Sequence, residues 1–161
     1  MYVADIDINV EPVYGIQFKD VVRFDRKDAN QFAFISSKGF DAVDPNIMYV
    51  ERDLDLFGSP VFPDNWMHEE TVLDASFEMT VECKNLLMVM KDSGDSQFGK
   101  ADVYVDGVLK RTLDPLEVGW NHSTAWILID EKETKKHKVQ VKMHDGDEAK
   151  LFTIQAFGMT R

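Results

Sequence analysis

The stretch ADVYVDGVLKRTL, residues 101–113, indicates the fold class of this chain. Apolar and polar side chains alternate before the central turn, so that Val103 and Val105 can share one face of a strand. The pair Asp106-Gly107 follows, and it favours a type I′ turn because both central residues of such a turn need a positive φ. The chain then returns as a second strand, so residues 101–113 predict an antiparallel β-hairpin.

Several other segments support the same fold class. Residues 4–10, 76–82 and 138–143 alternate with a period of two, which suits an antiparallel sheet with one solvated face. The runs NLLMVM at 85–90 and TAWILI at 124–129 are apolar throughout and too short for typical helices, which suits central strands. We therefore expect an all-β fold, an antiparallel two-sheet β-sandwich of the jelly-roll type. Four valines are expected to face its core: Val103, Val105, Val139 and Val141.

One segment predicts a departure from this pattern. In DEKETKKHK, which begins at Asp130, the spacing of Asp130 and Glu133 resembles a capping box, and lysines follow where a helix C-terminus favours positive charge. We expect one short helical turn near residues 130–137. No Gly-, Ser- or Pro-rich linker and no repeat divides the chain, so residues 1–161 are expected to form a single β-sandwich domain, excised from a larger multidomain enzyme.

The composition limits the possible partners. The chain has 161 residues, 44% of them apolar, and 29 acidic against 18 basic side chains give a formal net charge of −11. Phosphate backbones and anionic membranes attract clustered Lys and Arg, so nucleic acids and membranes are not expected partners. No run approaches the length of a membrane-spanning helix, and the N-terminus has no charged leader before an apolar segment. Either the protein stays inside the cell, or it is an extracellular or cell-surface domain whose signal sequence lies outside this fragment, and we expect the second.

The tripeptide Gly94-Asp95-Ser96 matches the start of the nucleophile motif of GDSL-type hydrolases. A serine hydrolase also needs a base, a group that orients this base, and donors for the oxyanion. Here the tripeptide lies in the middle of an all-β pattern, Gln97 replaces the usual Leu, and no Asp-x-x-His occurs near the C-terminus. We interpret the match as coincidental and expect no catalytic residue and no enzyme. A small esterase that uses Ser96 remains the competing hypothesis.

Metal chemistry has little support in the sequence. The four histidines show no i, i+4 pair, and the single cysteine, Cys83, excludes both a Cys-x-x-Cys motif and an intrachain disulfide. A catalytic zinc site and other cofactors are therefore not expected. A structural calcium ion held by carboxylates and loop carbonyls stays possible, although the repeating Asp pattern of a dedicated calcium loop is absent.

Two tryptophans suggest a sugar-binding surface. Trp66 and Trp120 lie among turn residues rather than in apolar runs, and polar side chains flank both of them. An indole ring can stack on the C–H face of a pyranose while neighbouring polar groups bind its hydroxyls. The alternative is that each Trp plugs an end of the sandwich, and Trp126, inside TAWILI, is expected in the core. The candidate ligand-binding residues are Trp66, Trp120, Asn121, His122, Asp64, Asn65 and Gln97.

The segment that starts CKNLLMVMKDSGDSQFGKADVYVDG at Cys83 and continues to the C-terminus resembles a known family. Its pattern has an apolar strand, FGKA leading into VYVDG, Gly119-Trp120-Asn121, HKVQVKM, an acidic GDE and a closing strand. It is similar to the accessory β-sandwich domains of SGNH/GDSL hydrolases and related polysaccharide-degrading enzymes of anaerobic gut and rumen bacteria. The resemblance implies a jelly-roll carbohydrate-binding module without catalysis. The family pattern commonly has Asn-Asn-Pro after the Trp, whereas this chain has Asn-His-Ser, so the loop contacts a different ligand or none.

Two functional hypotheses lead from these observations. In the first, the chain is a non-catalytic module that binds a plant polysaccharide of the β-glucan, xyloglucan or hemicellulose class through exposed Trp platforms. Its partners are then a polysaccharide or oligosaccharide and a covalently linked catalytic domain. In the second, the chain is a structural accessory domain that packs against an SGNH/GDSL esterase domain and binds no glycan itself.

Overall fold

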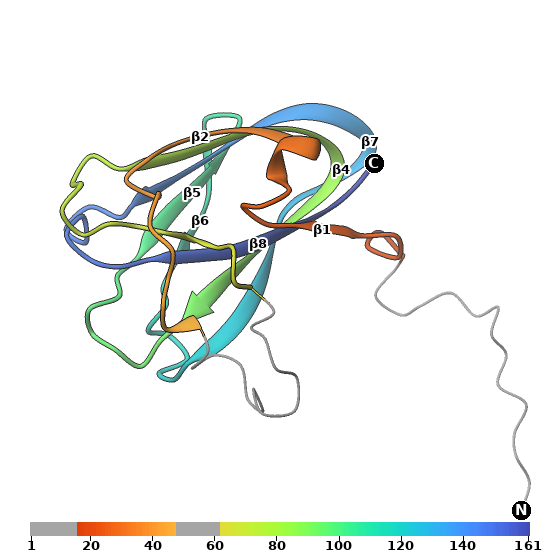
Figure 1. Cartoon of the computed structure of the whole chain (residues 1–161). Coiled ribbons are helices and arrows are strands. Elements are labelled where there is room, and N and C mark those ends of the chain that lie inside the picture. The colour runs from red at the N-terminus through yellow and green to blue at the C-terminus, as the bar shows by residue number, and fades with distance from the viewer. Residues whose placement is uncertain (1–15, 48–61) are drawn as a thin grey trace, which may run out of the picture.

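A computed structural model describes residues 16–47 and 62–161, so the strand predicted at residues 4–10 lies outside the described residues. Within these ranges the chain forms eight strands and one short 3₁₀ helix (Figure 1). The elements are β1 (Val22–Phe24), η1 (Ala29–Gln31), β2 (Ala33–Lys38), β3 (Trp66–Met67), β4 (Ser76–Asp92), β5 (Ala101–Val105), β6 (Val108–Leu113), β7 (His122–Met143) and β8 (Thr153–Thr160). All pairs between these strands are antiparallel.

The two long strands, β4 and β7, take part in both layers of the fold. Residues 76–83 of β4 pair with β2 and with the end of β7, whereas residues 85–92 pair with β8 and with the start of β7. Figure 1 shows both strands curving sharply between these halves, so that one continuous sheet folds back on itself. One layer continues from β7 into β5 and β6, and the other continues from β8 into β1 and β3. The predicted all-β sandwich is confirmed.

The core lies between the layers and is rich in aromatic rings. Phe77 of β4 and Phe157 of β8 are fully buried, and their rings stack with centroids 5.8 Å apart. The Trp66 ring makes T-shaped contacts with the Phe77 and Phe157 rings, at centroid distances of 5.4 and 5.8 Å. Each buried Phe contributes about 1.5–3 kcal/mol through removal of apolar surface from water, so this cluster ties the two layers together.

The hairpin that suggested the fold is present with the expected turn. Asp106 and Gly107 have φ values of 51° and 80°, which both lie in the left-handed region that a type I′ turn requires. The Asp106 carboxylate accepts a hydrogen bond from the Lys138 backbone N–H at 2.8 Å, so the turn is also bound to β7. The four valines predicted to face the core are buried: Val103, Val105, Val139 and Val141.

The predicted helical turn at residues 130–137 is wrong, because β7 runs without interruption from His122 to Met143. Its register on β4 shifts here, so that residues 131–134 lie opposite Lys84 alone. Within this bulge Glu131 and Lys135 form an ion pair at 2.5 Å, and the capping-box spacing of Asp130 and Glu133 caps no helix. Long-range pairing with β4 has therefore overridden the local preference. The one helical element in the described residues is η1.

The single cysteine, Cys83, lies in the core. Cys83 is fully buried on β4, and burial raises the pKa of its thiol to about 11, so the thiol stays protonated near neutral pH.

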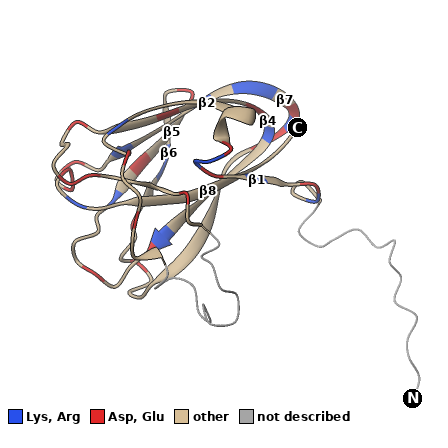
Figure 2. Ribbon diagram, viewed as in Figure 1, with Lys and Arg blue, Asp and Glu red and all other residues tan. Residues whose placement is uncertain are grey.

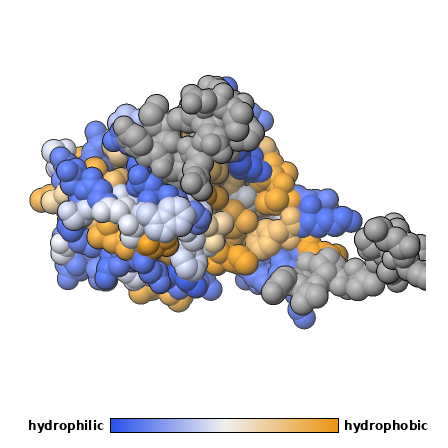
Figure 3. Space-filling view, turned by 90° about the horizontal axis from the view of Figure 1, so that it is seen from below, coloured by the Kyte–Doolittle hydropathy of each residue, from blue (hydrophilic) through white to orange (hydrophobic). Residues whose placement is uncertain are grey.

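In the described part of the chain, no helix has the length and apolar character to cross a membrane. On the face shown in Figure 3, apolar and polar surface alternate, and the broadest apolar area lies toward the side from which β1 projects.

Candidate functional site

The strongest candidate site lies where β4 ends and β7 begins. Asp92, the last residue of β4, is the register partner of His122, the first residue of β7. The loops that adjoin these strand ends are packed against each other, because the Ser93 backbone N–H donates to the Pro115 carbonyl oxygen at 2.8 Å. A Cβ atom on Gly94 would lie 2.9 Å from the Gly119 carbonyl oxygen, so the loops approach as closely as a glycine allows.

Trp120 is exposed at this end of the sandwich. Its exposed fraction is 59%, among the largest of the apolar side chains, and its ring lies 5.0 Å from the His122 ring with an interplanar angle of 57°. Gly119, which precedes it, has a φ of 77° and therefore lets the loop turn the indole outward. The sequence-based expectation that Trp120 presents a ring to solvent agrees with this geometry.

A polar network holds His122 beside the indole. The carboxylate of Asp92 is 4% exposed, and its Oδ2 atom accepts a hydrogen bond from His122 Nδ1 at 3.1 Å and one from the Thr124 hydroxyl. His122 Nδ1 also lies 3.2 Å from Thr124 Oγ1. With its proton on Nδ1, the neutral imidazole has Nε2 free as an acceptor for a ligand hydroxyl. Trp120, Asn121, His122, Thr124 and Asp92 are called the Trp120 surface below.

Asp92 and Thr124 were missed in the sequence analysis. Thr124 has period-two spacing from His122, so the strand pattern alone places both side chains on one face of β7. Asp92 is 30 residues away from His122 in the sequence, and only the register of β4 on β7 brings the two together. The strand spacing could have suggested Thr124, whereas Asp92 required the strand pairing.

The other candidates divide between this surface and the interior. Asn121 is half-buried next to Trp120, and Gln97 is exposed in the loop that contacts Gly119, where its backbone N–H donates to Asp95 Oδ1. Trp66 is only 3% exposed, so the expectation that it offers a stacking face to solvent is wrong. The physical reason is its place on β3, which pairs with β8 and directs the indole against Phe77 and Phe157.

The neighbours of Trp66 have structural contacts too. Asn65 is fully buried, and its side-chain oxygen accepts a hydrogen bond from the Asp44 backbone N–H at 2.8 Å. The half-buried Asp64 uses its backbone carbonyl to accept from the Arg26 N–H at 3.0 Å. Asn65 is therefore corrected from a ligand contact to a core residue, and neither residue belongs to the Trp120 surface.

Ser96 has none of the surroundings of a nucleophile in the described residues. It is exposed in a turn in which the Phe98 N–H donates to the Asp95 carbonyl, and no histidine of the described chain is hydrogen-bonded to it. Its backbone carbonyl accepts from Lys150 Nζ at 3.3 Å, so the contact that involves Ser96 does not use its hydroxyl.

Replacing Ser96 by Ala tests this interpretation. We expect the free energy of unfolding to change by no more than about 0.5 kcal/mol, because the side chain is exposed in a loop. We also expect no change in glycan binding, as measured by calorimetry. An activity of the isolated domain on an activated acetyl ester that disappears in Ser96→Ala would contradict the interpretation and restore the esterase hypothesis.

No metal site is visible where the chain is described: no group of three or more His, Cys, Asp or Glu side chains there is placed to hold an ion. The structural calcium ion considered in the sequence analysis has no cluster of three carboxylate or imidazole ligands among these residues. Trp126 is partly buried against the core, and the guanidinium of Arg111 lies 4.0 Å from the centroid of its ring system.

The fold is similar to parts of several carbohydrate esterases of known structure. A two-domain esterase active on acetylated mannans, crystallised with mannopentaose, matches with a TM-score of 0.64 and 21% identity over 90% of this chain and 38% of the esterase. A family two carbohydrate esterase from Cellvibrio japonicus matches with a TM-score of 0.57 and 11% identity over 88% of this chain and 33% of its own. An acetyl xylan esterase from the rumen bacterium Butyrivibrio proteoclasticus matches with a TM-score of 0.52 and 10% identity, over 86% of this chain and 32% of the esterase.

This chain thus spans between 32% and 38% of the length of these esterases. At such identities the similarity shows the fold alone. No family model and no curated protein sequence matches the chain.

Proposed function

We propose that this chain is a non-catalytic carbohydrate-binding module that recognises a polysaccharide through the Trp120 surface. The observation that carries the proposal is a 59%-exposed indole fixed beside an imidazole, which in turn is bound to a buried carboxylate. Packed loops set the position of the ring before any ligand arrives, which lowers the entropic cost of binding. An exposed ring with a polar margin is the arrangement that a sugar face and its hydroxyls require.

The roles of the individual groups follow from their chemistry. The indole of Trp120 stacks on the apolar face of one pyranose, His122 Nε2 accepts from a hydroxyl, and the amide of Asn121 both donates and accepts. Gln97 supplies a further amide from the adjoining loop. None of these groups carries a formal charge when the imidazole is neutral, so the surface suits an uncharged glycan.

The proposed ligands are hemicelluloses. Xyloglucan and mixed-linkage β-glucan belong to the polysaccharide class that the sequence suggests, and acetylated mannan is a further candidate because the esterase with a TM-score of 0.64 acts on it. We further propose that the chain belongs to a secreted, multidomain enzyme of plant cell wall degradation. This part of the proposal is supported by the fraction of the esterases that the chain spans, which suits one domain of a longer protein.

The partial coverage of the two-domain esterase also favours a second candidate function. A domain that spans 38% of a two-domain esterase can pack against a catalytic domain and complete its structure without binding glycan. Exposed apolar residues on β1, such as Val22 at 43%, and on β7, such as Ile127 at 54%, offer surface for such packing. The two functions differ in whether the isolated domain binds a soluble glycan.

Titration of the isolated domain with acetylated mannan, xyloglucan, mixed-linkage β-glucan and xylan tests the proposal. Replacing Trp120 by Ala should weaken binding to the preferred glycan about ten-fold or more, because stacking adds about 0.5–1.5 kcal/mol to the effect of the buried area. Binding should be insensitive to sodium chloride because a neutral glycan releases no counterions. Leu73→Ala, which removes a large apolar side chain that is 61% exposed and lies outside both proposed sites, is the control and should bind as the parent does.

Two results would count against the proposal. If none of the four glycans binds to a domain that circular dichroism shows to be folded, the packing function is favoured instead. If a glycan binds and Trp120→Ala keeps the parent's affinity, the chain is a carbohydrate-binding module whose site lies elsewhere on its surface.

A further inference from the structure

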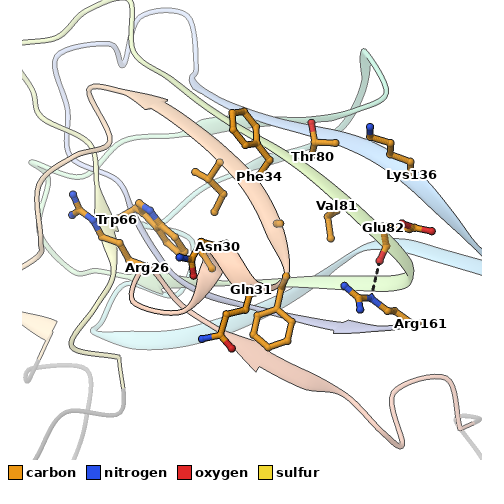
Figure 4. A pocket seen from close by; sticks show the side chains of 14 residues that line it. Arg26, Asn30, Gln31, Phe34, Trp66, Thr80, Val81, Glu82, Lys136 and Arg161 are labelled. Carbon is orange, nitrogen blue, oxygen red and sulfur yellow. Dashed lines mark hydrogen bonds between the residues drawn. The ribbon is translucent and has the colours of Figure 1, made fainter.

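A second surface, separate from the Trp120 surface, contains a cavity of about 750 Å³. It is lined by β2, η1, the middle of β4, the bend of β7 and Arg161, which follows β8 (Figure 4). Its volume lies within the range of about 300–1,000 Å³ that is usual for sites of small molecules and short oligomers. No residue of the Trp120 surface lines it.

The cavity has an apolar floor. Trp66, Ile35 and Val81 contribute buried or half-buried apolar surface, and Trp66 can present only an edge because it is 3% exposed. Phe34 is 75% exposed, since the alternating pattern of β2 directs its ring to the outer face of the layer and away from this floor. The floor therefore offers the apolar surface for the flat C–H face of a sugar ring.

Two guanidinium groups in the lining are held in place without being neutralised. Arg26 donates from Nη2 to the Asp41 carbonyl oxygen at 2.6 Å and from Nη1 to that of Ala42 at 3.2 Å. Arg161 donates from Nε to the Glu82 carbonyl oxygen at 3.4 Å, the contact drawn in Figure 4. Backbone carbonyls carry no formal charge, so both side chains keep a net positive charge toward a ligand.

Lys136 adds a third positive charge. Among the described residues, neither Lys136 nor Arg26 nor Arg161 has a carboxylate within ion-pair distance. Figure 4 shows Arg26 and Arg161 on opposite sides of the view, whereas the Lys136 side chain points to the outer face of β4, as Phe34 and Thr80 do. Figure 2 shows basic segments where β7 bends and on the loop that leads to η1. The two cations that can reach a ligand on the apolar floor are therefore Arg26 and Arg161.

This local charge is opposite to that of the whole chain. The lining contains three basic side chains and one acidic side chain, Glu82, whereas the chain has 29 acidic and 18 basic residues. Two exposed amide side chains, Asn30 and Gln31, stand in the same lining and can donate to and accept from hydroxyl groups. The cavity thus combines an apolar floor, amides for hydroxyls, and cations at both ends.

We propose that this cavity binds an anionic oligosaccharide with acidic groups on at least two of its units. One acidic group pairs with Arg161 and the other with Arg26, while the sugar rings between them contact the apolar floor. The acidic groups can be uronate carboxylates or sulfate esters, since both accept paired hydrogen bonds from a guanidinium. The proposal does not depend on the Trp120 surface, which suits an uncharged glycan.

The test is a calorimetric titration with three probes. Trigalacturonate supplies carboxylates, a sulfated carrageenan tetrasaccharide supplies sulfate esters, and the fully methyl-esterified trigalacturonate is the uncharged match of the first. We expect one of the two acidic probes to bind about ten-fold or more tightly than the esterified probe, because a charge-assisted hydrogen bond is lost with each acidic group. Added sodium chloride should weaken the binding of the acidic probe through screening.

Three variants locate the binding. The double variant Arg26→Gln/Arg161→Gln should weaken the binding of the acidic probe about ten-fold or more. The double variant Lys132→Gln/Lys142→Gln removes the same charge from two exposed residues of β7 that do not line the cavity, and it should bind as the parent does. Trp120→Ala should also leave this binding unchanged, which keeps the test independent of the proposed hemicellulose site. Thermal unfolding confirms that each variant is folded.

Several outcomes would overturn the proposal. They are an absence of binding for both acidic probes, equal affinity for the acidic and the esterified trimer, and equal weakening by Lys132→Gln/Lys142→Gln and by Arg26→Gln/Arg161→Gln. The last outcome would show attraction to the basic surface in general rather than to the cavity.

Discussion

Replacing Asp44 by Ala is expected to lower the free energy of unfolding by about 3–5 kcal/mol, because it leaves the charge of Lys91 buried without its carboxylate partner. The side chains of this pair are 2% and 3% exposed, and Lys91 Nζ lies 2.8 Å from Asp44 Oδ2. Thr153 donates to the same oxygen at 2.9 Å, and Asp44 Oδ1 accepts from the Asn46 N–H. The change therefore disrupts a whole network rather than one contact.

Denaturant unfolding of two further variants separates this effect from the general cost of a mutation. Glu78→Ala breaks the exposed pair with Lys138 and should cost no more than about 1 kcal/mol. The double variant Asp44→Leu/Lys91→Met replaces both charges by apolar groups and should recover much of the loss. A loss below about 1 kcal/mol for Asp44→Ala would show that Lys91 finds water or another partner when the carboxylate is removed.

Replacing Trp66 by Ala should be similarly destabilising, by about 3–5 kcal/mol, because it leaves a large cavity beside Phe77 and Phe157. The same change at Trp120 should alter the free energy of unfolding by no more than about 0.5 kcal/mol, because that ring is exposed. Denaturant unfolding followed by far-UV circular dichroism compares the two, since it does not depend on Trp fluorescence.

The comparison also separates binding from stability. At a temperature at which Trp66→Ala is still folded, this variant should bind neutral glycan as the parent does, whereas Trp120→Ala should not. Equal destabilisation by the two changes would mean that the Trp120 loop is part of the core. In that case the proposed binding surface would lose its basis.

Much of the fold follows from local patterns in the sequence. Alternation and the Asp106-Gly107 turn predict β5 and β6, and the apolar runs at 85–90 and 124–129 lie within β4 and β7. These signals are local, since side chains of a strand alternate between its faces whatever strand lies beside it. Local patterns do not show which strand a segment pairs with. For this reason they predict a helical turn where the structure has the bulge at residues 131–134.

The candidate site residues are also only partly predictable from local sequence. Trp120, Asn121 and His122 are consecutive, so a short polar stretch around one Trp was enough to suggest them. Trp66 has an equally polar neighbourhood in the sequence, yet β3 pairs with β8 and turns its ring into the core. Whether a Trp between polar residues is exposed depends on the strand pairing around it. The residue types next to it in the sequence do not reveal this pairing.

The shared strands β4 and β7 also determine how the protein opens. Because each runs through both layers, neither layer can separate from the other as an independent unit while these strands stay paired. We therefore expect local opening to be confined to the loops and to short edge strands such as β1, and we expect the central amides of β4 to exchange with deuterium only when the whole domain unfolds. Since Phe77 pairs with Val141 and Asn85 with Thr160, the chain must also close long loops before this unit forms. Such a topology folds in milliseconds to seconds.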